Sequence, residues 1–206
     1  TRTNLDGNVW VYDPAAGQYK DRNSYGMGSL TEGIIPVGQG FFVRTTAGGA
    51  GLTIPVNARL HSGQDYYKNS DSESTNLSYL VFGVSKESKS DEVWIAFNEA
   101  CTDEVDMGWD VEKFFGDLDA PQLYTSANEL NFSTIALSPV VIDRPTIVAL
   151  NFLATEDGKH NLSLKSIENL EVSEIWIEDL ATGNLQDMKK TPFYEFDATV
   201  NQSPER

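Results

Sequence analysis

The chain has 206 residues, of which 40% are hydrophobic and 11% aromatic, so it can bury the core of one large domain or two small ones. Its formal net charge of -16 repels phosphate groups, which argues against binding to nucleic acids or to anionic membranes. Its single cysteine, Cys101, excludes an internal disulfide and is interpreted as a small, half-buried hydrophobe.

Strand signals dominate the first 62 residues, which we predict to form a small N-terminal β module. Residues 9–12 and 18–20 flank Asp-Pro-Ala-Ala-Gly, a turn sequence, and together they predict a hairpin. Residues 41–45 predict a buried strand and residues 52–60 its return strand. The polar stretch 63–76 is then the linker to a second domain.

The second domain, residues 77–206, is predicted to be a β-sandwich. In residues 93–97, three apolar side chains alternate with Trp94 and Ala96, the period-2 pattern of a strand. One short helix is expected over 106–116, where Asp110 is suited to cap the helix start. The further predicted strands are 77–84, 123–126, 130–135, 146–154, 160–165, 175–180, 185–188 and 193–198.

Many short strands separated by turn signals indicate an all-β fold. We therefore expect a jelly-roll or immunoglobulin-like β-sandwich with a smaller N-terminal β module and the one short helix. No signal peptide opens the chain, and no apolar run approaches the roughly 20 residues that a membrane helix needs. Both ends resemble interior points of a longer chain, so we expect a piece of a larger protein.

Four segments carry a resemblance to a known family. They are residues 11–19 (VYDPAAGQY), 35–43 (IPVGQGFFV), 119–125 (DAPQLYT) and 177–183 (IEDLATG). In order and spacing they resemble the C-terminal β-sandwich region of secreted and cell-surface Bacteroidetes proteins, the region that precedes a type IX secretion sorting domain. The resemblance implies export, an extracellular or cell-surface location, and a covalently linked upstream domain that is catalytic or adhesive. It implies no activity of this region itself.

Residues able to carry out catalysis are sparse. The two histidines, His61 and His160, lie far apart in the chain without metal-ligand spacing, and a Gly-x-Ser-x-Gly nucleophile elbow is absent. Gly38-Gln39-Gly40 lacks the Lys-Ser/Thr of a phosphate loop and leads into a strand. We therefore predict a non-enzyme, with a hydrolase as the weakest alternative.

A cluster of acids between residues 103 and 119 has three interpretations. The first is a solvated loop with helix caps, and the second is a calcium site, because Ca²⁺ takes several oxygen ligands. The calcium ligands would be Asp103, Asp106 and Asp110. A catalytic carboxylate pair is the third.

Aromatic residues give the better functional lead. Sugar-binding modules stack planar rings on the apolar faces of pyranose units. Trp10 and Tyr12 are two residues apart and share one face of a strand, and Tyr19 is expected across the hairpin from them. With Tyr25 they form the predicted ligand platform, although burial in a core is the ordinary fate of such rings.

The sequence therefore predicts a non-catalytic accessory module of a secreted protein. Its predicted role is binding to a polysaccharide or another cell-surface glycan, or adhesion. The alternative is a structural spacer between an upstream domain and a secretion signal. Calcium is the one cofactor considered, and neither nucleic acid nor membrane insertion is expected.

Overall fold

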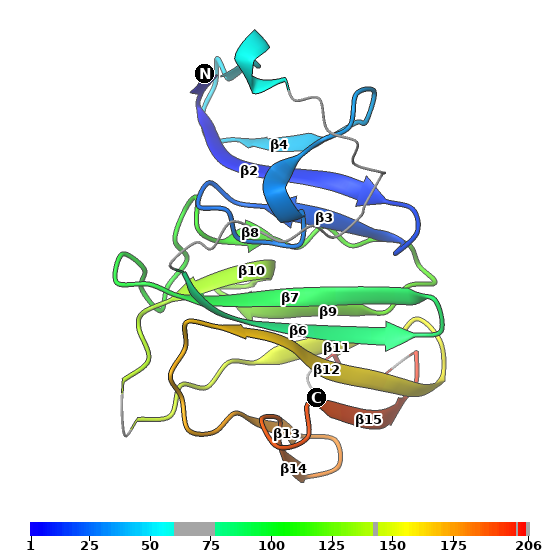
Figure 1. The fold of residues 1–206 in the computed structure, drawn as a ribbon. Coiled ribbons are helices and arrows are strands. Elements are labelled where there is room, and N and C mark those ends of the chain that lie inside the picture. The colour runs from blue at the N-terminus through cyan, green and yellow to red at the C-terminus, as the bar shows by residue number, and fades with distance from the viewer. Residues whose placement is uncertain (60–76, 142–143, 201, 205–206) are drawn as a thin grey trace.

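The computed structural model describes residues 1–59, 77–141, 144–200 and 202–204, and within them the fold is all-β, as predicted (Figure 1). Two short 3-10 turns, η1 (Thr31–Gly33) and η2 (Val56–Ala58), are the helical elements of this part of the chain. None of its helices has the length and apolar character to cross a membrane. The predicted linker 63–76 lies outside the described residues.

The N-terminal module consists of two small antiparallel sheets. Strand β2 (Leu5–Asp13) lies between β3 (Gln18–Arg22) and β4 (Phe42–Thr45), while β1 (Arg2–Thr3) pairs with β5 (Gly51–Leu52). The predicted hairpin is confirmed. At its turn the Gly17 amide donates to the Asp13 carbonyl at 2.9 Å, and Gly17 has a φ of 68°, a conformation that favours glycine.

The second part of the chain is built on one eight-stranded sheet. Its order is β11-β9-β10-β7-β6-β12-β15, with β8 paired to β10, and β7 and β10 are parallel while the other pairs are antiparallel. The strands are β6 (Ser78–Lys86), β7 (Lys89–Phe97), β8 (Val111–Glu112), β9 (Gln122–Ala127), β10 (Leu130–Leu137), β11 (Leu150–Leu153), β12 (Gly158–Glu168) and β15 (Phe193–Ala198).

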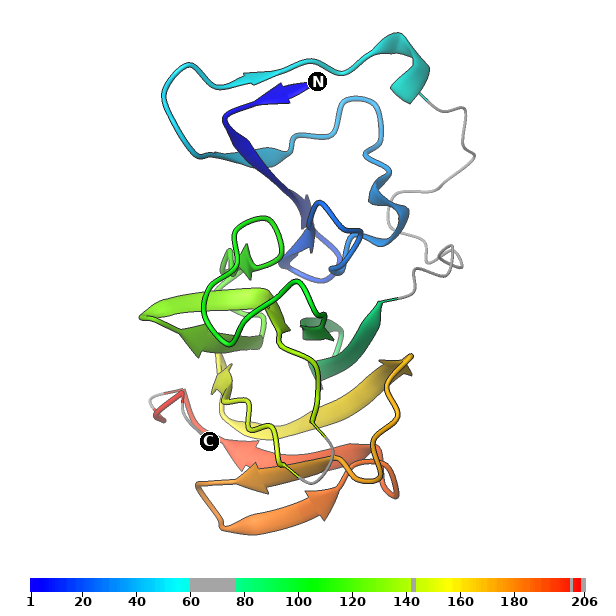
Figure 2. The ribbon, with the colours of Figure 1, turned by 90° about the vertical axis from the view of Figure 1, so that its left-hand side faces the viewer.

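The sheet curls until its two edge strands approach each other (Figure 2). Phe152 of β11 meets Phe196 of β15 edge-on, with 5.1 Å between ring centroids, and the Phe152 amide donates to the Pro204 carbonyl at 2.8 Å. The hairpin β13 (Trp176–Asp179) and β14 (Asn184–Asp187) lies below the curl in Figure 1. The walls of a single curled sheet thus enclose the apolar core, as the two layers of a sandwich do.

Side chains on β7 alternate between two cores. Val93, Ile95 and Phe97 point into the curl, whereas Ala96 belongs to a second cluster on the opposite face. That second cluster joins the N-terminal module to the sheet, and its buried members are Met27, Ala96, Cys101, Trp109 and Ala136. Cys101 is buried rather than half-buried, and this burial raises the pKa of its thiol to about 11.

Polar contacts reinforce this junction, which we call the seam: the buried contact between residues 8–30 and residues 91–136. The Asn8 side chain donates to the Asp110 carbonyl at 2.8 Å, and the Asn23 side chain donates to the Trp109 carbonyl at 2.6 Å. Within the sheet part of the chain, Lys113 and Asp91 form a buried ion pair at 2.5 Å. The two modules therefore share buried polar and apolar contacts.

Three local predictions are wrong. Residues 106–116 are not helical, because Val111 pairs with Thr134 of β10, and Gly108 has a φ of 86°. β4 is exposed along its whole length rather than buried. The return strand of residues 52–60 shortens to β5, which pairs with β1 instead of β4.

Candidate functional site

One face of the three-stranded N-terminal sheet carries a cluster of aromatic rings, here called the aromatic face: Trp10, Tyr12, Tyr19, Phe42 and Phe114. Strand register creates it, because Tyr12 pairs with Tyr19 across the hairpin, as predicted, and Trp10 pairs with Phe42 on the other side. Phe114 reaches the cluster from the chain that follows β8. The edge-on ring contacts have centroid separations of 5.3 to 5.9 Å.

The rings of the aromatic face differ in exposure. Trp10 is only 1% exposed, because Phe114 stacks on it with 4.6 Å between centroids and its Nε1 donates to the Glu112 carbonyl at 3.0 Å. Phe42 is 52% exposed, and Tyr12 and Tyr19 are half-buried. The prediction that Trp10 is an exposed platform residue is therefore wrong, since Trp10 lies buried beneath the other rings. Phe42, which was not predicted, is an exposed member of the aromatic face.

Charged groups border the aromatic face. The Tyr12 hydroxyl donates to Asp117 Oδ1 at 2.6 Å, and this hydrogen bond, with burial and the nearby negative charge, raises the pKa of Tyr12 to about 12. Arg44 of β4 pairs with Glu112 at 2.7 Å. A ligand on these rings would therefore meet a guanidinium and carboxylates at their margin.

Tyr25, the fourth residue of the predicted platform, stacks on Trp109 instead. Their centroids are 3.6 Å apart and the rings are nearly parallel, which leaves Tyr25 46% exposed. Trp109 belongs to the seam cluster and is buried. One face of the Tyr25 ring thus stacks on Trp109 and covers the seam.

The three predicted calcium ligands bind groups of their own chain. Asp103 accepts from the Ser138 hydroxyl, Asp106 Oδ2 accepts from the Thr102 amide at 2.6 Å, and Asp110 accepts from the Asp106 and Ala136 amides at 2.7 Å each. Among the described residues, His, Cys, Asp and Glu side chains form no group of three or more that could hold a metal ion. These carboxylates therefore order a loop.

Asp110 is the buried member of this loop. Burial raises the pKa of Asp110 to about 6, while the bonds from the Ala136 and Asp106 amides oppose that shift. Its role is not the predicted helix cap, because both of its oxygens accept from backbone amides, one of them on β10. It fastens the 106–110 loop to the sheet.

Of the two histidines, one is described by the structure and is a packing residue. His160 is buried against Phe152 and Phe196, and its Nδ1 lies 3.0 Å from the Gly158 carbonyl. His61 lies outside the described residues. His160 therefore contributes to the interior of the curl.

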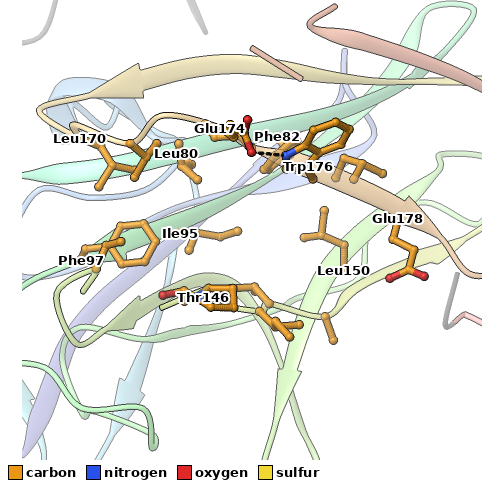
Figure 3. A pocket seen from close by; sticks show the side chains of 18 of the residues that line it. Leu80, Phe82, Ile95, Phe97, Thr146, Leu150, Leu170, Glu174, Trp176 and Glu178 are labelled. Carbon is orange, nitrogen blue, oxygen red and sulfur yellow. Dashed lines mark hydrogen bonds between the residues drawn. The ribbon is translucent and has the colours of Figure 1, made fainter. Parts of the chain in front are cut away.

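A concave feature runs along the inside of the curled sheet, a cavity of about 1690 Å³ that we call the trough (Figure 3). Its floor is apolar: Leu80, Phe82, Ile95 and Phe97 come from β6 and β7. Leu150 of β11 lies on the opposite wall. Residues 139–141, 144–149 and 170–180 complete the border.

The mouth of the trough is acidic. Trp176 of β13 is 50% exposed there, and its Nε1 donates to Glu174 Oε2 at 3.0 Å (Figure 3). Glu99, Glu171 and Glu178 also line the trough and are exposed. Trp176 is the most exposed of the four tryptophans.

Comparison with known proteins places the chain in one family. Residues 7–206 match the model of a domain of unknown function, DUF8693. Neither the search of curated proteins nor the search of solved structures found a match. Because the matched residues span nearly the whole chain, the chain belongs to the DUF8693 family.

Proposed function

We propose that this chain is a non-catalytic accessory module that binds a glycan through its aromatic face. The observation that supports the proposal is the grouping of Tyr12, Tyr19 and Phe42 on three neighbouring strands, each ring at least partly exposed. Strands joined by backbone hydrogen bonds hold the rings in place before a ligand arrives, which lowers the entropic cost of binding.

The chemistry of the margin fits a sugar. A pyranose ring has apolar C–H faces, which pack on aromatic rings, and hydroxyl groups around its edge, which form hydrogen bonds. Arg44 and Asp117 supply a donor and an acceptor beside the rings. An uncharged or basic glycan is favoured, because the chain has a net charge of -16.

The proposal of a module without catalysis rests on the roles of its buried acids and of the acidic loop. Asp91, Asp103, Asp106 and Asp110 all accept hydrogen bonds from their own chain. Together with the resemblance to exported Bacteroidetes proteins, this favours a surface-located module attached to another domain, which would carry any activity.

A second function is favoured by the seam. A spacer has to transmit orientation between its ends. The hydrogen bonds from the Asn8 and Asn23 side chains to residues 109–110 and the Met27 cluster couple the N-terminal module to the sheet. A spacer role and glycan binding are compatible. The seam buries residues of β2 and β3, but it leaves Phe42 of the aromatic face exposed.

A glycan array with the intact chain tests the first proposal. We expect binding to a restricted set of polysaccharides, and competition by the corresponding soluble oligosaccharide at millimolar concentration. Binding to no glycan on a broad array, while the protein gives a cooperative unfolding transition, would leave the spacer function as the better account.

A further inference from the structure

The Tyr12 end of the aromatic face has two carboxylates that share one ammonium group. Lys89 Nζ lies 3.5 Å from Asp117 Oδ2 and 3.9 Å from Asp119 Oδ1. Two negative charges therefore face one positive charge, and one carboxylate is left in excess among these three groups. The side chains of Asp117 and Asp119 are 42% and 65% exposed, so a ligand on the rings can reach both.

The margin beside Phe42 is balanced in charge. Arg44 follows Phe42 by two residues on β4, and it pairs with Glu112 at 2.7 Å. One cation and one anion therefore stand together there. The aromatic face thus has an acidic pole beside Tyr12 and a neutral margin beside Phe42.

The acidic pole lies close enough to the rings to act on them. The Tyr12 hydroxyl donates to Asp117 Oδ1 at 2.6 Å. This hydrogen bond, burial and the charges of Asp117 and Asp119 together raise the pKa of Tyr12 to about 12. Because Tyr12 occupies Oδ1 of Asp117, the acceptors left for a ligand are Oδ2 and the Asp119 carboxylate.

A sugar that packs on these rings would present its edge to the acidic pole, because the substituents of a pyranose lie around its edge. An ammonium group at that edge would form charge-assisted hydrogen bonds with Asp117 and Asp119. The same group would be attracted by the electron-rich faces of Tyr12 and Tyr19. A sulfate or carboxylate would be repelled, and an acetamido group has no charge to balance the carboxylates.

We propose that the aromatic face selects a glycan with free amino groups, a polymer of deacetylated amino sugars. A pyranose ring packs on Tyr12 and Tyr19 with its protonated amino group toward Asp117 and Asp119, and the next unit continues toward Phe42. The net charge of -16 adds a long-range attraction for such a polycation. This inference rests on the proposed glycan function and specifies its substrate class.

Calorimetric titration with two matched oligomers tests the proposal. The probes are the tetramers of glucosamine and of N-acetylglucosamine, which share a backbone and differ in the charge of one substituent. At mildly acidic pH, where the amines are protonated, we expect the glucosamine tetramer to bind roughly tenfold more tightly, with the difference shrinking at high salt. Equal affinities, tighter binding of the acetylated tetramer, or binding of neither would overturn the proposal.

The failure of this inference can be told apart from the failure of the glycan function. Binding of the acetylated tetramer with equal or higher affinity, and its loss in Phe42→Ala, would keep the aromatic face as a glycan site and refute its selection of amines. Binding to no sugar, on the array or in the titration, would refute both.

A polycation without sugar rings controls for non-specific attraction to the acidic chain. Tetralysine that is acetylated and amidated at its ends has four ammonium groups, as the glucosamine tetramer does. We expect Phe42→Ala to weaken the glucosamine tetramer roughly tenfold and to leave the weak binding of tetralysine unchanged. Tetralysine that binds as tightly as the glucosamine tetramer would contradict recognition of a sugar.

A pair of variants locates the ammonium group. Asp119→Asn should weaken the glucosamine tetramer several-fold and leave the acetylated tetramer unchanged. Glu195→Gln is the matched control, because Asp119 and Glu195 are 65% and 58% exposed and each pairs with a lysine, but Glu195 lies on β15. Equal losses in the two variants would assign the attraction to net charge and would overturn the proposal.

Discussion

The Thr134 hydroxyl of β10 donates to Asp21 Oδ2 of β3 at 2.9 Å, and this buried hydrogen bond joins residues 113 positions apart. Asp21 also accepts from the Ser29 hydroxyl at 2.8 Å. Burial raises the pKa of Asp21, and the bonds from Ser29 and Thr134 oppose that shift. The seam thus binds the N-terminal module to the sheet through buried polar groups. These groups can become exposed to solvent only together.

The first prediction is a single unfolding transition. Because the two modules share the seam, separating them would expose its buried polar groups and its apolar cluster together. Differential scanning calorimetry of the intact chain should give one endotherm whose van't Hoff and calorimetric enthalpies agree. Two resolved transitions would mean that the modules unfold independently and would remove the basis of the rigid-spacer role.

A second prediction concerns the close approach of two backbones at the seam. A Cβ added to Gly116 would lie 2.0 Å from the Gly17 carbonyl oxygen, and the Asp117 amide donates to that same carbonyl at 2.7 Å. Gly116→Ala should therefore destabilise the fold by about 1–3 kcal/mol. Gly48→Ala is the control, because nothing lies within 4 Å of its added Cβ. Urea unfolding that gave the two variants equal midpoints would contradict so close an approach.

The third prediction compares a buried ion pair with an exposed one. Lys113 and Asp91 are almost fully buried, so Lys113→Met leaves a buried carboxylate without its counter-charge and should cost about 3 kcal/mol, since Asp91 keeps its bond from the Leu123 amide. The Lys159–Glu195 pair is exposed on both sides, and Lys159→Met should leave the stability nearly unchanged. Similar losses in the two variants would argue that Lys113 is solvated.

The fourth prediction is a pH dependence due to Asp110. Its pKa is about 6 in the folded chain and 3.8 by itself, so the folded state binds more protons between these values. The free energy of unfolding should therefore fall as pH rises from about 4 to 6 and level off above that range, as far as Asp110 contributes.

Asp110→Asn isolates this contribution. Denaturant unfolding at several pH values should show a shallower dependence in Asp110→Asn than in the unchanged chain, whereas Asp119→Asn, an exposed control, should preserve the slope. A slope that survives in Asp110→Asn would assign the effect to another buried acid, with Asp21 the next to examine.

Most strands could be predicted from the sequence, because period-2 alternation and turn residues are local signals. Strand 193–198 has the predicted bounds, and the predicted strands 175–180 and 185–188 correspond to the hairpin of β13 and β14. The prediction of a helix over 106–116 is wrong because the deciding signal is not local. Its capping and apolar spacing were compatible with a helix, but pairing of Val111 with β10 depends on contacts distant in sequence.

Only part of the candidate site could be predicted from the sequence. The pairing of Tyr12 with Tyr19 follows from hairpin register. Trp10 is buried by Phe114, which lies more than a hundred positions away in the chain, so no local sequence pattern predicts this burial. The trough arises from the curl of a whole sheet, which strand spacing alone does not determine.

The glycan proposal is tested most directly by titrating two matched variants with the best oligosaccharide from the array. Phe42 and Phe193 are 52% and 56% exposed, so replacing either with Ala removes a similar area, but only Phe42 belongs to the aromatic face. Isothermal titration calorimetry should show roughly tenfold weaker binding for Phe42→Ala and unchanged binding for Phe193→Ala. Unchanged binding in Phe42→Ala, or equal losses in both variants, would contradict the aromatic face as the ligand site.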